Sequence, residues 1–87
     1  MTLNKNFVLR QVADTWVVLP LGEATLDFHG MLTLNESGAM LWNKIECGCN
    51  PDELAEVLTA EYNVSYSQAL ADVNEFIDKL AKAGCIG

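Results

Sequence analysis

The stretch GMLTLNESGAMLW, residues 30–42, joins a segment that favours a β-strand directly to the start of a helix. Residues 31–34 are three apolar residues and a threonine, which is typical of a short strand. Asn35 follows as a natural N-cap, and the apolar residues after it recur at helical spacing. The stretch therefore predicts a strand at 31–34 and a helix over about 36–45, with Leu41, Trp42 and Ile45 facing the core.

Two segments rich in β-branched and aromatic residues, 7–12 and 15–19, precede this stretch and predict a β-hairpin. Only Ala13 and Asp14 separate them. Asp14 suits a tight turn, whereas Ala13 is poorly suited to the positive φ that two-residue hairpin loops require. We therefore expect the loop to take one further residue from each strand.

The segment after residue 50 carries a full set of helix start signals. Asn50 can act as N-cap, Pro51 occupies the first helical position, and Glu53 can complete a capping box. These signals predict a helix over 51–62. Its buried stripe is expected to consist of Leu54, Val57, Leu58 and Tyr62.

A third helix is expected to follow Ser65, which repeats the capping-box pattern with Gln68, and to stop at Gly84. Its apolar residues continue at spacings of three and four. Phe76 is rotated away from the line of its other apolar side chains. Periodicity alone favours a core position for Phe76, and the wall of a groove is the alternative.

Three strands followed by three helices predict an α+β domain that spans residues 1–87. A chain of 87 residues with 51% apolar content can build one hydrophobic core. A catalytic cleft would compete with that core for the same few side chains. We therefore expect a binding module and not an enzyme.

The charge balance argues against nucleic acid as a partner. Twelve acidic residues and five basic ones give a net charge of -7. Binding to a polyanion depends on clustered Lys and Arg, which this chain lacks. A winged-helix DNA-binding protein is an alternative of the same fold class, but its third helix would expose Asp72, Glu75 and Asp78 against two lysines.

No segment resembles a signal peptide or the roughly 20 apolar residues of a membrane span. We therefore expect a cytoplasmic protein that contacts no membrane. The odd number of cysteines, three, also fits a reducing compartment better than a disulfide framework.

The three cysteines raise a second alternative, a small metal-binding protein. Cys47 and Cys49, with Cys85 and the single histidine His29, offer four potential ligands. Structural zinc sites usually separate paired ligands by two residues, which the Cys-x-Cys pair does not match. The sequence therefore predicts no metal, and its dispersed glycines predict no phosphate-bearing cofactor.

The stretch 30–42 also resembles the signature of the PqqD-like family, in which a strand leads into Leu-Asn-x-(Ser/Thr)-(Gly/Ala) and then a helix with a bulky apolar pair. The segments ELAEVL at 53–58, EYNV at 61–64 and ADVxxFI at 71–77 resemble the family's remaining blocks in the same order. The likeness covers roughly residues 7–87. The Cys47-Gly48-Cys49 loop departs from the Asp-Gly turn common in the family.

The resemblance implies a winged-helix-like domain that acts as a recognition element for ribosomally made, modified peptides. In such domains the leader of a precursor peptide adds as an extra strand beside the third strand, in a groove next to the third helix. The domain then presents the peptide to a modifying enzyme, which is a radical SAM protein in pyrroloquinoline quinone synthesis. Carried over by position, the binding residues are Met31, Leu32, Thr33 and Leu34 on the strand and Asp72, Phe76, Lys79 and Leu80 on the helix.

The pathway stays open at this point. A purely structural subunit of an enzyme complex is a third alternative, which differs only in whether a free peptide is bound.

Overall fold

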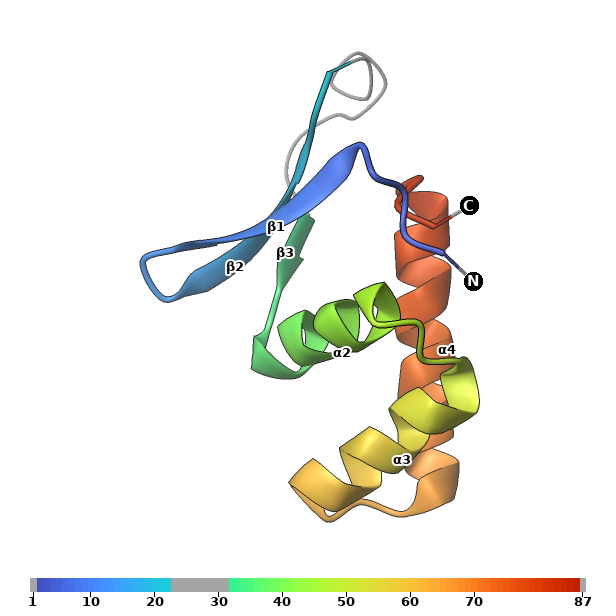
Figure 1. The fold of residues 1–87 in the computed structure, drawn as a ribbon. Coiled ribbons are helices and arrows are strands. Elements are labelled where there is room, and N and C mark those ends of the chain that lie inside the picture. The colour runs from blue at the N-terminus through green and yellow to red at the C-terminus, as the bar shows by residue number, and fades with distance from the viewer. Residues whose placement is uncertain (1, 23–31, 87) are drawn as a thin grey trace.

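The computed structural model describes residues 2–22 and 32–86. Figure 1 shows a small sheet beside three helices, which confirms the expected α+β order. Met31 and His29 lie outside the described residues. The elements are β1 (Phe7–Val12), β2 (Thr15–Pro20), β3 (Leu32–Leu34), α2 (Glu36–Glu46), α3 (Pro51–Tyr62) and α4 (Tyr66–Lys82).

The hairpin loop differs from its prediction. Val12 pairs directly with Thr15, so the loop consists of Ala13 and Asp14 alone and takes nothing from the strands. Ala13 adopts the positive φ, 55°. Continuous pairing of β1 and β2 outweighs the steric cost of a left-handed alanine, which is about 1 kcal/mol.

The sheet has the order β1-β2-β3, with both neighbouring pairs antiparallel. The backbone N–H of Leu21 donates to the carbonyl of Asn6 at 2.6 Å, which places the peptide groups of Leu21 on the β1 side. Peptide groups alternate in direction along a strand, and neither pairing contains a bulge. The peptide groups of Trp16 and Val18 therefore point toward β3.

The helix starts follow the predicted caps. The side chain of Asn35 accepts from the N–H of Gly38 at 2.8 Å, and Asn50 forms the complete capping box with Glu53. Ser65 forms only half of the expected box: it accepts from the N–H of Gln68 at 3.2 Å. The side chain of Gln68 instead donates to Asp72 on the next turn at 2.9 Å.

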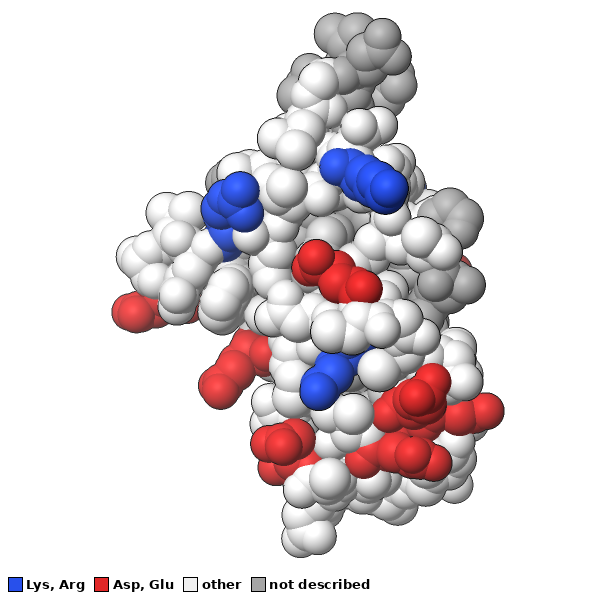
Figure 2. Space-filling model, in the orientation of Figure 1, with Lys and Arg blue, Asp and Glu red and all other residues white. Residues whose placement is uncertain are grey.

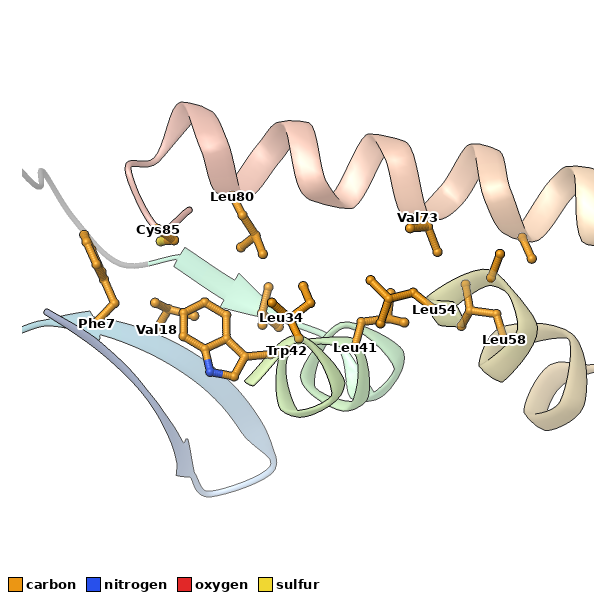
Figure 3. Close-up of a cluster of buried hydrophobic side chains, with 13 residues drawn as sticks. Phe7, Val18, Leu34, Leu41, Trp42, Leu54, Leu58, Val73, Leu80 and Cys85 are labelled. Carbon is orange, nitrogen blue, oxygen red and sulfur yellow. The ribbon is translucent and has the colours of Figure 1, made fainter. Parts of the chain in front are cut away.

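One hydrophobic cluster joins the sheet to all three helices. Figure 3 shows Trp42 of α2 beside Val18 of β2, with Leu80 and Val73 descending from α4. Trp42 is 1% exposed and Val18, Leu80 and Val73 are fully buried, which confirms that α2 and α4 turn their apolar stripes inward.

The two ends of the described chain lie together at the C-terminal end of α4 (Figure 1). Leu3 forms an antiparallel bridge with Ile86, and the N–H of Asn4 donates to the carbonyl of Cys85 at 2.7 Å. None of the helices in the described part of the chain is both long and apolar enough to cross a membrane.

We expect Ala13→Gly to raise the free energy of unfolding by about 0.5 to 1 kcal/mol, because glycine adopts a positive φ without the clash of a Cβ. Urea denaturation with an unchanged slope would measure the effect. Asn63→Gly is the matched control: Asn63 also has a positive φ, 52°, but asparagine tolerates it, so the gain should be smaller. A stability of Ala13→Gly at or below that of the wild type would contradict the prediction.

Candidate functional site

The outer edge of β3 lies on the side of the strand away from β2. Leu32 and Leu34 lie opposite Val18 and Trp16, whose peptide groups point toward β3. Leu32 and Leu34 therefore direct their own N–H and C=O groups inward, and those of Thr33 point away from the sheet. Among the described residues no strand pairs with this edge, so Thr33 offers one donor and one acceptor to an incoming strand.

A groove of about 390 Å³ lies beside this edge, between the end of β3, the start of α2 and one stripe of α4. Its lining includes the buried side chains of Leu34, Leu41 and Leu58. These side chains come from three different elements, so only the assembled fold creates the apolar lining.

Gly38 allows α4 to approach the first turn of α2 closely. A Cβ at this position would lie 3.3 Å from Cε1 of Phe76 and 3.2 Å from Cβ of Leu34. Phe76 is half-buried and both packs on the core and lines the groove. The two interpretations of Phe76 from periodicity are therefore both correct in part.

The joint between α3 and α4 supplies the opposite part of the groove lining. Tyr62 was predicted to be buried, but it is 44% exposed and lines the groove together with Val64. Asn63 ends α3 in the left-handed conformation and so reverses the chain between them. Sequence periodicity did not reveal the exposure of Tyr62. Periodicity shows on which face of a helix a residue lies, but not whether the neighbouring helix extends far enough to cover it.

The seven predicted binding residues that the structure describes separate into three groups. Leu34, Asp72, Phe76 and Lys79 line the groove, and Leu32 and Thr33 belong to the adjoining strand. Leu80 is fully buried in the core and does not line the groove. Its position, one residue beyond Lys79, turns it toward the sheet, where it supports the fold; a contact with the peptide stays untested. Met31 lies outside the described residues.

Among the described residues, the charges at the groove come from α4: Asp72, Glu75 and Lys79. The carboxylate of Asp72 accepts the hydrogen bond from Gln68, which holds it in place. On the face shown in Figure 2, acidic side chains predominate over the helical half of the molecule. A net negative groove does not suit a phosphate backbone.

The cysteines show a graded exposure. Cys47 is exposed, Cys49 is half-buried and Cys85 is buried. Burial raises the pKa of the Cys85 thiol. Within residues 2–22 and 32–86, no three His, Cys, Asp or Glu side chains gather in a way that suits a metal ion. That the protein holds no metal stays a prediction.

The fold and the groove define a small α+β domain in which the outer edge of β3 lies beside an apolar cleft. The family model described as coenzyme PQQ synthesis protein D (PqqD) matches residues 15–86, and the chain belongs to this family. Comparison with curated proteins finds no match.

Two solved structures share the fold. One is TbiB1 in complex with the TbiA(beta) leader peptide, with 24% identity, a TM-score of 0.81, and coverage of 99% of this chain and 94% of that chain. The other is a lasso peptide synthetase B1 complexed with the leader peptide, with 24% identity, a TM-score of 0.79, and coverage of 95% and 92%.

We expect alkylating reagents to modify Cys47 first, Cys49 more slowly, and Cys85 only after unfolding. The thiolate is the reactive species, and burial both excludes the reagent from Cys85 and keeps its thiol protonated. Peptide mapping by mass spectrometry over time, with and without urea, gives the order. Rapid modification of Cys85 in the folded protein would contradict the buried placement.

Proposed function

We propose that this chain binds the leader region of a ribosomally made precursor peptide by β-strand addition to β3 and presents it to a modifying enzyme. The main observation behind this proposal is that the peptide group of Thr33 points away from the sheet, beside an apolar groove. In strand addition, backbone hydrogen bonds supply affinity and side-chain pockets supply selectivity. Here the edge and the pocket lie next to each other.

The comparisons support this proposal. The family is named for synthesis of the coenzyme PQQ, and both solved structures of the same fold contain a leader peptide. One of those proteins is a lasso peptide synthetase B1. The partner enzyme of this chain is therefore proposed only as a peptide-modifying enzyme, with a radical SAM protein as one candidate. Which pathway it serves depends on that partner.

A binding role also fits the chemistry of the groove. Among the described residues no polar or charged side chain is buried, so none is held in the dry, oriented environment that acid-base catalysis uses. The groove is apolar at its base and charged only at its rim. We therefore propose a single cytoplasmic recognition domain over residues 1–87, without catalytic activity or cofactor, that contacts neither nucleic acid nor membrane.

Thr33→Pro should weaken leader binding about tenfold or more while the domain stays folded. Proline removes the outward N–H, and a peptide carbonyl left without its donor costs about 1 to 3 kcal/mol. Calorimetry with a leader peptide that binds the wild-type protein would measure the affinity. Circular dichroism would verify the fold.

Leu32→Pro is the matched control, because it removes an N–H that points toward β2. It should lower the free energy of unfolding by about 1 to 3 kcal/mol. Full affinity in a folded Thr33→Pro variant would exclude strand addition at this edge.

Phe76→Ala should weaken leader binding by about 1 to 3 kcal/mol if the ring anchors an apolar side chain of the peptide. The neighbouring Ile77 is also half-buried and packs on the core, but it does not line the groove. Ile77→Ala should therefore reduce stability and leave affinity in the folded protein unchanged. Equal affinity losses in both variants would indicate a general effect on folding and place the binding surface elsewhere.

A further inference from the structure

The charged residues of the groove are sorted by sign along α4. Asp72 and Glu75 precede Phe76 on the groove-facing stripe, and Lys79 follows it. With a rise of about 1.5 Å per residue, Asp72 lies about 6 Å before Phe76 along the helix axis and Lys79 about 4.5 Å after it. The groove therefore has an acidic end and a basic end, with an aromatic ring between them.

These charges are available to a ligand. Lys82 pairs with Asp78 at 2.9 Å, away from the groove. Glu75 and Lys79 are four residues apart on the same helix, yet no ion pair joins them within the part of the chain that the structure describes. Gln68 already orients the carboxylate of Asp72.

The relative direction of β3 and α4 determines which part of a bound peptide lies beside the acidic residues and which part lies beside Lys79. Figures 1 and 3 both show β3 and α4 running in opposite directions. A strand added antiparallel to β3, as the rest of the sheet is built, therefore runs in the same direction as α4. Its amino-terminal part passes Asp72 and Glu75, and its carboxyl-terminal part passes Lys79.

The spacing of a strand matches the spacing of these charges. Side chains two residues apart project from the same face of a strand and lie about 6.7 Å from each other. When one side chain contacts Phe76, the side chain two positions earlier reaches the acidic end. The side chain two positions later reaches Lys79.

We infer that this groove selects a peptide in which an apolar residue is preceded, two positions earlier, by a basic residue and followed, two positions later, by an acidic one. This inference rests on the proposed function, since it assumes strand addition at β3. Asp72, Glu75 and Lys79 are then specificity-determining residues. The apolar contact sets the position of the strand, and the charges set which sequences bind.

Three synthetic peptides of equal length test the inference, each with a central leucine in an otherwise threonine and valine strand sequence. The first carries lysine two positions before the leucine and glutamate two positions after it, the second has these two exchanged, and the third has glutamine at both. NMR titration of labelled protein would measure each affinity. At low ionic strength the first peptide should bind about threefold to tenfold more tightly than the second, and salt should reduce the difference.

Lys79→Glu should remove this preference and improve binding of a peptide with lysine on both sides of the leucine. Lys82→Glu makes the same change of charge on α4 outside the groove and should leave the preference intact. If the first two peptides bind with equal affinity and change the NMR chemical shifts of β3 and the groove residues, the charge preference is wrong but strand addition stands. No shifts at β3 or the groove with any peptide would overturn strand addition and the preference with it.

Discussion

The hydrogen bond from the N–H of Gly38 to the side chain of Asn35, 2.8 Å long, sets the point at which β3 becomes α2. It stops the strand and satisfies one of the free donors at the start of the helix. The rest of the structure depends on this junction. It directs Trp42 into the core, and it places Gly38, which has no side chain, where Phe76 of α4 packs.

The same junction accounts for the groove. β3 is short and, within the part of the chain that the structure describes, pairs only with β2, so it contributes an edge as well as core contacts. Packing of α4 against the start of α2 leaves apolar surface beside that edge instead of covering it. An open strand edge invites unwanted pairing, and the charged residues of α4 beside it restrict which chains can bind there.

The acidic character of the helical half has a consequence for recognition. Exposed ion pairs add little to the stability of a folded protein, but charges at a binding surface discriminate between ligands that share the same backbone hydrogen bonds. A recognition domain that binds mainly through the backbone needs such discrimination. In the proposed mode of binding, the sorted charges of α4 would supply this discrimination without a buried ion pair and its cost of desolvation.

The sequence by itself determined the order of the elements, the starts of the helices and most of the core, because caps and periodicity act within a few residues. Asn35 and Asn50 cap as predicted, and Leu41, Trp42 and Ile45 are buried as predicted. The likeness to PqqD-like sequences also led to the strand and helix that border the groove. Only the tertiary structure decided which side chains are exposed and in which direction the peptide groups of the edge strand point.

The features that only the tertiary structure decided include the exposure of Tyr62, the burial of Leu80 and the outward peptide group of Thr33. Each depends on the placement of an element far away in the chain: the end of α3 against α4, α4 against the sheet, and β3 against β2. The positive φ of Ala13 belongs here too, because the pairing of whole strands overrode a local preference. Local signals specify elements, whereas the direction of a side chain or peptide group at a binding edge is a property of their packing.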